Sequence, residues 1–302
     1  MHIESAISAT AFARNKLRIY WQYTKPRIWL LFAVEACAGA VLGYNHEGSP
    51  PLIRIAAIVL SVALGAIGAE AFTNVIDKEI DSRMERTKSR PLPTNAISSG
   101  EALTLGAVAV AGSLMLAEAL GTFPLLLIAI GLIDNIVIYS MLSKRTTPWS
   151  IVLGSVSGGV PIWAGYAAIR LPISAAGWLL GLLVLAWIPL HIWTIAYAYA
   201  EDYRVANVPM APVVWSRRRF GWTLAAASVV LFGIALVGDG LLWHRQIAFV
   251  LLADLAAMAL LIITTQFALQ PSILRAKQAF MACNIYLLLL FIAIIAVGSF
   301  VK

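Results

Sequence analysis

The chain has 302 residues, of which 61% are hydrophobic and only 12% are charged, and its mean hydropathy is +0.85. Soluble domains are roughly 45–50% apolar and about 25% charged, so the composition excludes a soluble globular enzyme, a disordered chain and a disulfide scaffold. The two cysteines, Cys37 and Cys283, stand in apolar runs and cannot form a disulfide framework. The formal charge of +7 could indicate nucleic-acid binding, but the positions of the basic residues argue against it.

Nine apolar runs are long enough to be membrane-spanning helices, which need about 20 mostly apolar residues. In chain order they lie near residues 28–44, 52–74, 102–119, 121–140, 149–168, 174–199, 220–238, 246–265 and 280–300. The first 27 residues are mixed and basic and lack the apolar core of a cleaved signal peptide. The sequence therefore predicts an all-α, polytopic membrane protein.

The basic residues lie almost entirely on one side of the membrane when the loops between nine spans alternate sides. All of the 22 Lys and Arg residues except Arg54, Arg170, Arg245 and Lys302 fall on the side of the N-terminus. Because Lys and Arg are retained in cytoplasmic loops, we expect the N-terminus to be cytoplasmic. Topology thus explains the basic excess, and nucleic acid is not an expected partner.

A polar cluster follows the second predicted span, in the stretch TNVIDKEIDSRMERTKSRPL. Asn74, Asp77 and Asp81 are spaced i, i+3 and i+7, which places them on one face of a helix. Two carboxylates and an amide one turn apart suit Mg²⁺, which often binds substrate phosphates as well, and four basic residues follow directly. A diphosphate would use both groups, although an ordinary charged loop with ion pairs at a membrane boundary would have a similar composition.

Two further stretches on the same side carry candidate residues. Tyr139, Lys144 and Arg145 end the fourth span, where the residues alone favour positive-inside anchors and an interfacial aromatic residue. His191 lies inside the sixth span, 11 residues before Asp202; a polar side chain in a span is a candidate functional residue, but a lone His is commonly a packing residue. Glu70, one turn before Asn74, is left outside the predicted site.

The first stretch resembles the first signature of the UbiA superfamily of intramembrane prenyltransferases. More narrowly, it resembles the heme branch, the protoheme IX farnesyltransferases, whose pattern is matched by Asn74, Asp77, Asp81, Met84, Arg86, Thr87, Arg90, Pro91 and Leu92. The stretches TKPRI at 24–28, YSMLSKRTTPWSIVLGSVSGGVPIWAGYAA and WIPLHIWTIAYAYAEDYRVANVPMAPVV match in order, so the resemblance covers about residues 24–219. Thr73 stands where many other superfamily members have asparagine, which favours the heme branch.

The sequence departs from the family pattern at two positions. The second motif of the superfamily, Asp-x-x-x-Asp, retains Asp202 but has Ala198 in place of its first aspartate, so a second metal would lack one ligand. Leu190 replaces the second proline of the pair that precedes His191, which affects only the local helix shape.

The resemblance implies a single prenyltransferase domain over residues 1–302, a bundle of about nine helices around a central cavity open to the cytoplasm. It implies farnesyl diphosphate and heme b as substrates, heme O and diphosphate as products, and Mg²⁺ as cofactor. We expect Asn74, Asp77, Asp81 and Asp202 as metal ligands, and Asp77, Asp81, Arg86 and Lys144 as catalytic residues. The remaining expected substrate contacts are Lys25, Arg27, Arg90, Tyr139, Arg145 and His191, with His191 placed against heme.

The expected surroundings are the lipid bilayer of the cell membrane, with heme A synthase or a terminal oxidase as candidate partners. Alternatives are a relative that prenylates an aromatic or lipid acceptor, a transporter and a non-catalytic scaffold. A transporter would show repeats or helices broken at the midplane, whereas the charged clusters here lie at the cytoplasmic rim.

Overall fold

The computed structural model describes residues 16–44, 51–242 and 247–300, with side chains omitted at 239–253 and 296–300. Arg14, Arg245 and Lys302, which entered the charge count, lie outside the described residues. After a helix at 16–23, the elements are α2 (Pro26–Gly43), α3 (Leu52–Ile76), α4 (Lys78–Arg83), α5 (Ser99–Leu120), α6 (Thr122–Ile133), the π-helix η1 (Asp134–Ser143), α7 (Ser150–Leu153), α8 (Val156–Ile169), α9 (Ala175–Ala198), α10 (Ala200–Val205), α11 (Ala211–Val214), α12 (Arg217–Leu242), α13 (Ile247–Leu269) and α14 (Ile273–Phe300). Within these ranges all regular structure is helical, which confirms the predicted fold class.

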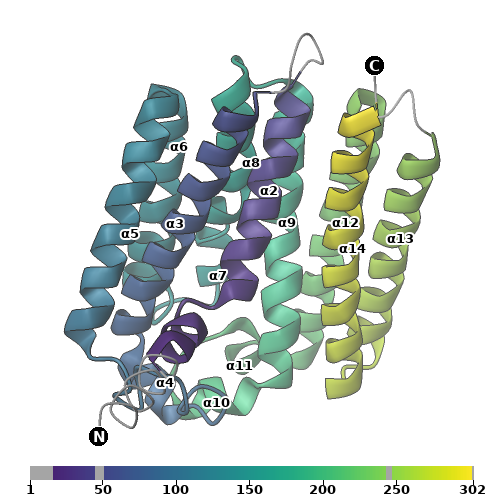
Figure 1. Cartoon of the computed structure of the whole chain (residues 1–302). Helices are drawn as coiled ribbons and strands as arrows, with labels where there is room; N and C mark the ends of the chain where they lie inside the picture. Colours follow the sequence, from purple (N-terminus) through teal and green to yellow (C-terminus); the bar gives the residue numbers. More distant parts are fainter. Residues whose placement is uncertain (1–15, 45–50, 243–246, 301–302) are drawn as a thin grey trace, which may run out of the picture.

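The predicted spans correspond to long helices of the bundle in Figure 1. Among the described residues, eight helical segments are long and apolar enough to cross a membrane, and two of them are the continuous runs Thr122–Ser143 and Ser150–Ile169. The remaining predicted span, the eighth in chain order, corresponds to α13, whose fully described portion, Asp254–Leu269, is apolar but shorter than a span. The bundle therefore has the predicted order of long helices, with a count of eight or nine spans.

Small residues let neighbouring helices approach closely. A Cβ atom added at Gly39 of α2 would lie 2.1 Å from the carbonyl oxygen of Ile162 in α8, and one added at Gly165 would lie 2.1 Å from the carbonyl oxygen of Ala36. Lipid supplies no hydrophobic force between helices, so close backbone packing of this kind is a main source of association energy. The α2–α8 contact depends on these two glycines.

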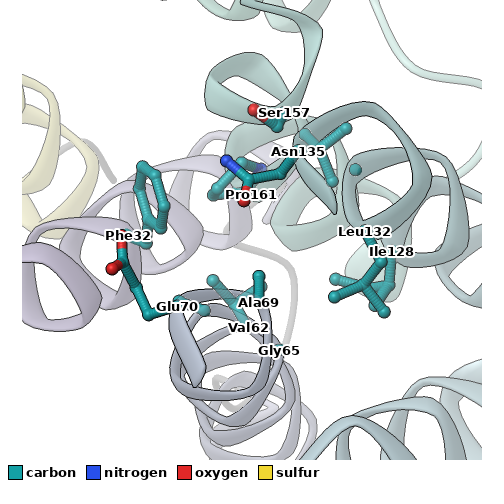
Figure 2. Close-up of a pocket in the computed structure, with 13 residues that line it drawn as sticks. Phe32, Val62, Gly65, Ala69, Glu70, Ile128, Leu132, Asn135, Ser157 and Pro161 are labelled. Atoms are coloured by element: carbon teal, nitrogen blue, oxygen red, sulfur yellow. The ribbon is translucent and has the colours of Figure 1, made fainter. Parts of the chain in front are cut away.

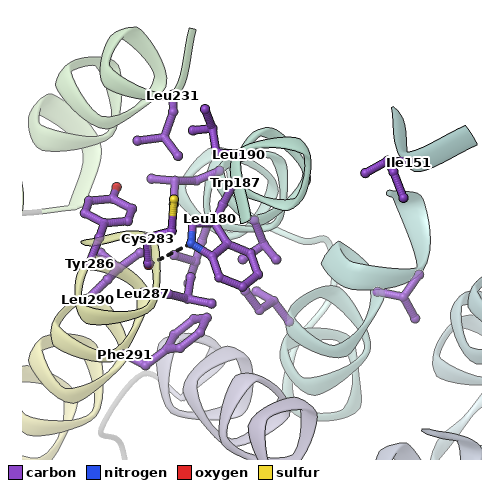
Figure 3. Packing of buried hydrophobic residues seen from close by; sticks show 14 of the residues in the cluster. Ile151, Leu180, Trp187, Leu190, Leu231, Cys283, Tyr286, Leu287, Leu290 and Phe291 are labelled. Carbon is purple, nitrogen blue, oxygen red and sulfur yellow. Dashed lines mark hydrogen bonds between the residues drawn. The ribbon is translucent and has the colours of Figure 1, made fainter. Parts of the chain in front are cut away.

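Hydrogen bonds between helices complete the packing. The Ser61 hydroxyl of α3 donates to the carbonyl of Ser113 in α5, and the Ser113 hydroxyl donates to the carbonyl of Ser61, both at 2.7 Å. Trp187 of α9 donates its indole N–H to the carbonyl oxygen of Cys283 in α14 at 2.8 Å (Figure 3). A buried donor in a low-dielectric interior needs such a partner, so these contacts fix the pairing of helices far apart in sequence.

Most of the short elements lie at one end of the bundle. Helix 16–23, α4, α10 and α11 lie there, beside the C-terminal ends of α3 and α9 (Figure 1). At the opposite end, Arg54 donates to the carbonyl oxygens of Ala168 and Leu120 at 2.8 and 2.9 Å, and thereby ties three connections together. One end of the bundle, called the polar end below, thus carries several short helices, whereas among the described residues the other end has only loops between the long helices.

Candidate active site

A cavity of about 240 Å³ opens among the elements at the polar end. Its charged and polar lining comes from six parts of the chain: the turn before α2, the end of α3, α4 with the following loop, η1 with the residue that follows it, the end of α9, and α10. The side chains lining it are Lys25, Glu70, Thr73, Asn74, Asp77, Ile80, Asp81, Met84, Arg86, Arg90, Asn135, Tyr139, Lys144, Ile192, Ile195, Tyr199 and Tyr203. Eight of the residues expected from the sequence therefore meet in one place.

The end of α3 forms the acidic wall of this cavity. Asn74, Asp77 and Asp81 are all buried and line the cavity together, as their spacing predicts. Asp77 closes α3 by donating its N–H to the carbonyl of Thr73, and Asp81 continues the turn by donating to the carbonyl of Asp77, both at 2.8 Å. The near-continuous helical path through Asp77 keeps the two carboxylates about one turn apart on the same face.

Each of these carboxylates is held by a cation. Asp77 forms a hydrogen-bonded ion pair with Lys144, and both side chains are largely buried, with exposed fractions of 9% and 14%. Asp81 accepts from Arg90 at 2.8 Å. Burial makes an unpaired charge costly, so such pairs persist where both partners are present.

Lys144 follows a helix with an uncommon backbone conformation. η1 is a π-helix, and it ends with the Lys144 N–H donating to the carbonyl of Tyr139, five residues back, at 2.8 Å. π-helical turns are rare and occur frequently at functional sites. Burial alone would lower the pKa of the Lys144 ammonium, but Tyr139 and then Asp77 beside it outweigh that effect and raise the pKa above its ordinary value. Lys144 is therefore a persistent cation in the cavity wall.

Lys25 and Glu70 form a third ion pair, between the turn before α2 and the C-terminal part of α3. Lys25 Nζ lies 2.5 Å from Glu70 Oε2, with exposed fractions of 24% and 19%. The backbone of Lys25 is left-handed, with φ at 49°, a conformation that is uncommon for a non-glycine residue and costs about 1–3 kcal/mol. This turn directs the chain into Pro26 at the start of α2 and places the ammonium at the cavity.

Tyr23 contacts α3 close to the pair of Lys25 and Glu70. Its hydroxyl donates to the carbonyl of Ala71 at 3.0 Å. Burial raises the pKa of Tyr23 to about 12, against an opposing hydrogen bond with Asn74 and with a contribution from the charge of Glu70. Tyr23 therefore stays a neutral hydrogen-bond donor that fixes helix 16–23 against α3.

The loop after α4 carries Arg86 and Arg90. Its backbone is fixed by Thr87, whose hydroxyl donates to the carbonyl of Asp81 at 2.9 Å, and by Asp202, whose Oδ2 accepts from the Arg86 N–H at 3.1 Å. The Arg86 guanidinium lies over the ring of Tyr199, 5.4 Å from its centroid. The loop is thus tied to α10 while its two arginines face the cavity.

A second, apolar pocket adjoins the first, deeper among α2, α3, α6 and α8. It has a volume of about 60 Å³ and is lined mostly by small or apolar residues, including Phe32, Val62, Ala69, Ile128 and Leu132 (Figure 2). Glu70 and Asn135 line both spaces. Glu70 and Asn135 therefore stand where the polar cavity adjoins an apolar pocket inside the helical bundle.

Four of the expected site residues lie outside the cavity lining. Arg27 is exposed in the first turn of α2. Arg145 donates to the carbonyl of Ile76 at 2.6 Å. His191 stacks on Trp187 and Phe280, at centroid distances of 4.4 and 4.7 Å. Asp202 holds the Arg86 loop, so its expected role as a metal ligand stays a prediction.

Several lining residues were not expected from the sequence. Glu70 precedes Asn74 by one turn, so the helical spacing that selected Asn74 extends to it. Asn135 precedes Tyr139 by four residues within the fourth span, where an amide is itself a signal of a polar interior. Tyr199 and Tyr203 flank Asp202 at the polar end. Helical spacing around known site residues would have found the first two.

The cavity suits a hard cation. Within the residues that the structure describes, no three His, Cys, Asp or Glu side chains gather into a ready-made metal site. Mg²⁺ in proteins often uses one or two carboxylates and takes its other ligands from water and substrate phosphates. Asp77 and Asp81 are such carboxylates, and Asp77 Oδ1 is buried without a hydrogen-bond partner. The donor set therefore fits Mg²⁺ that is bound together with a phosphate-bearing substrate.

Comparison with known proteins agrees with this geometry. The chain is 34% identical to the protoheme IX farnesyltransferase of Thermoplasma acidophilum over 282 aligned residues. The alignment covers 93% of this chain and 98% of that protein. The chain is also 37% identical over 253 residues to the protoheme IX farnesyltransferase of Desulforudis audaxviator, in an alignment that covers 82% of this chain and 78% of the relative.

Solved structures share the fold. A digeranylgeranylglyceryl phosphate synthase superposes with a TM-score of 0.77 at 16% identity, covering 94% of this chain and 99% of that one. A UbiA homologue from Archaeoglobus fulgidus bound to GPP and Mg²⁺ superposes with a TM-score of 0.69 at 17% identity, covering 91% and 99%. Residues 32–295 match the UbiA prenyltransferase family. Together with the paired carboxylates and cations at the polar end of the bundle, this match shows that the chain belongs to the UbiA prenyltransferase family and is an integral membrane prenyltransferase.

Proposed function

We propose that this protein transfers the farnesyl group of farnesyl diphosphate to a vinyl group of heme b, with heme O and diphosphate as products. The observation that supports the acceptor is the one-third identity to protoheme IX farnesyltransferases over more than 90% of the chain. The observation that supports the donor is the cationic, carboxylate-bearing cavity that adjoins an apolar pocket. The entire chain is proposed to act as one prenyltransferase domain.

The polar cavity is proposed to bind the diphosphate. Asp77 and Asp81, with Asn74 beside them, would hold Mg²⁺, which when bound neutralises phosphate charge. Lys25, Arg86, Arg90 and Lys144 line the same cavity and supply positive charge to the phosphate oxygens. Stabilising the leaving group in this way lets the allylic C–O bond break, which is electrostatic catalysis.

The apolar pocket is proposed to receive the allylic end of the hydrocarbon chain. Its apolar lining keeps water away from the allylic cation after the C–O bond breaks. The vinyl carbon of heme then forms the new C–C bond with its π electrons. Water adds to the resulting porphyrin-side cation and loses a proton, which gives the hydroxyethylfarnesyl group of heme O.

The roles of the four peripheral residues remain proposals of the same function. Arg27 and Arg145 would attract the diphosphate toward the cavity mouth, and Asp202 would orient the metal or its ligands through the Arg86 loop. His191, stacked between Trp187 and Phe280, would contact heme from α9.

We further propose that the protein lies in the cell membrane with its N-terminus and the cavity mouth on the cytoplasmic side, following the basic residues. Heme A synthase or a terminal oxidase would then be a partner, because each would receive the heme product.

The test is an assay of the purified protein in detergent with heme b, farnesyl diphosphate and Mg²⁺, read by mass spectrometry of the pigment. The expected product is heme that has gained one farnesyl group and one water, and adding EDTA should abolish its formation. Consumption of farnesyl diphosphate without a heme product, but with quinone precursors as acceptors, would overturn the heme assignment and indicate another branch of the family.

A further inference from the structure

The polar cavity and the apolar pocket meet at Glu70 and Asn135, the residues that line both. Figure 2 shows the two side chains projecting from different helices, Glu70 from α3 and Asn135 from η1, with Phe32 and Leu132 on the apolar walls. Glu70 lies one helical turn before Asn74 in the chain, whereas Asp77 and Asp81 follow Asn74. Glu70 is thus a carboxylate set apart from the expected metal ligands.

The boundary locates the reacting bond of an amphiphilic substrate. On the proposed function, a prenyl diphosphate places its phosphates among the cations of the polar cavity and the allylic end of its hydrocarbon chain in the apolar pocket. The two parts of such a molecule are joined at the C1–O bond. That bond must therefore lie where the lining changes from polar to apolar, which is beside Glu70 and Asn135.

We propose that Glu70 is a further catalytic residue, which stabilises the positive charge that develops on C1 of the prenyl group. Of the two boundary side chains, only Glu70 can carry a negative charge. The Lys25 ammonium, 2.5 Å away, offsets the cost of holding a carboxylate with 19% exposure at the edge of an apolar space. The carboxylate is therefore fixed before the substrate reacts.

This placement favours the transition state over the bound substrate. Before reaction, the carboxylate repels the phosphate oxygens nearby. As the C1–O bond breaks, its electron pair leaves with the diphosphate, and C1 becomes positive beside Glu70. An interaction that strengthens only as charge develops raises the turnover number without tightening substrate binding. Glu70 forms no bond and transfers no proton; the electrons of the acceptor complete the new C–C bond.

Glu70→Gln tests the charge with little change in shape, because the amide oxygen can still accept from Lys25. The turnover of farnesyl diphosphate is expected to fall roughly 10- to 100-fold. Binding of farnesyl thiolodiphosphate, in which sulfur slows ionisation, is expected to stay equal or become tighter. Lys25→Met is the contrasting variant and is expected to weaken binding of the analogue. Glu85→Gln, at the exposed pair with Lys88, is the matched control and should leave both values unchanged.

Two results would overturn the proposal: turnover of Glu70→Gln within twofold of the wild type, or a loss of analogue binding as large as the loss of turnover. Melting temperatures of all variants in micelles distinguish these results from misfolding, and Glu70→Asp, which keeps the charge, should recover part of the turnover. Release of diphosphate without any acceptor measures ionisation alone. If the wild type ionises farnesyl diphosphate but does not modify heme, the proposed acceptor fails while the Glu70 comparison stands.

Discussion

At the scale of single residues, the polar cavity is a set of matched opposite charges. Lys25 holds Glu70, Lys144 holds Asp77 and Arg90 holds Asp81. Pairing of this kind allows charges to persist where water is scarce. A bound diphosphate would compete with these carboxylates for the same three cations. Substrate binding is therefore expected to replace carboxylate contacts of the cations with phosphate contacts. Arg86 lies over the ring of Tyr199, and among the described residues it has no ion-paired carboxylate to release.

Asp77→Asn and Asp81→Asn test the proposed metal role. Each change keeps the size and one acceptor oxygen of the side chain but removes a charge that Mg²⁺ prefers. We expect turnover to fall at least about a hundredfold in each variant, measured as heme product formed at saturating Mg²⁺. Glu79→Gln, an exposed residue of α4 paired with Arg83, is the control. Near-normal turnover in either aspartate variant would contradict the metal role.

Lys144→Met tests the buried ion pair. Removing the cation leaves Asp77 buried and unpaired, which costs about 3–5 kcal/mol of folding free energy, so the melting temperature in micelles should drop clearly. Lys88→Met, at an exposed pair, should change it little. A Lys144→Met protein that melts within about one degree of the wild type would contradict this account, since about 1 kcal/mol already shifts the midpoint by a few degrees.

The pH dependence of this pair follows from the raised pKa of Lys144. A cation whose folded-state pKa exceeds its unfolded value, about 10.4, stabilises the fold fully below that unfolded value. The contribution is lost as pH rises through the folded pKa. The melting-temperature difference between wild type and Lys144→Met should therefore stay constant from neutral pH to about pH 10. A difference that shrinks between pH 7 and pH 9 would show that Lys144 loses its proton early.

Much of the site was predictable from residue spacing, and the remainder was not for a physical reason. Asn74, Asp77 and Asp81 share a face because α3 and α4 continue the helical rotation, so the period alone places them together. The partner of Asp77 is Lys144, 67 positions away directly after η1, and the partner of Asp81 is Arg90, in a loop without periodicity, so spacing cannot predict which cation meets which carboxylate. The residue pattern marked Lys144 and Arg90 only as candidates among several basic residues, and the resemblance to a family selected them as site residues.

At the scale of elements, apolar length predicted the long helices and their order, because a lipid-facing helix must be apolar over its whole span. The short helices α4, α10 and α11 and the π-helical path of η1 were not predicted. Their sequences contain the same polar residues as any membrane-boundary loop, and a π-helix depends on tertiary contacts that leave no period in the sequence. Of these elements, α4, α10 and η1 contribute side chains to the lining of the cavity.

Gly165→Val tests the contact between α2 and α8. A Cβ atom there would lie 2.1 Å from the carbonyl oxygen of Ala36, which belongs to a helix backbone and cannot move aside cheaply. Overpacking typically costs about 1–3 kcal/mol, so the variant should melt at a lower temperature or fail to accumulate in the membrane. Gly233→Ala in α12, where nothing lies within 4 Å of the added Cβ, should be neutral or stabilising. Equal melting temperatures for the two variants would refute the close-packing argument.

At the scale of the whole molecule, the two ends of the bundle differ in charge and in complexity. The cavity, its cations and most of the short helices lie at one end of the bundle. The other end has short loops between helices, which Arg54 joins through its hydrogen bonds to Ala168 and Leu120. The charge asymmetry of the sequence predicts this division, because Lys and Arg are retained on the cytoplasmic side during insertion. In the proposed orientation, this division would give a diphosphate made in the cytoplasm direct access to the cavity.

Single cysteines at the two ends test this orientation. In a chain with Cys37→Ala and Cys283→Ala, Ser89→Cys introduces a thiol in the exposed loop at the cavity end, and Arg170→Cys introduces one at the exposed end of α8. A membrane-impermeant maleimide applied to intact spheroplasts should label only the Arg170→Cys protein, and applied to inverted vesicles it should label only the Ser89→Cys protein. The opposite pattern would place the cavity mouth outside the cell, where neither basic-residue retention nor a cytoplasmic supply of prenyl diphosphate could hold. Labelling of both proteins in both preparations, with membranes shown to be sealed, would mean that the chain inserts in two orientations and that its charge asymmetry is too weak to decide between them.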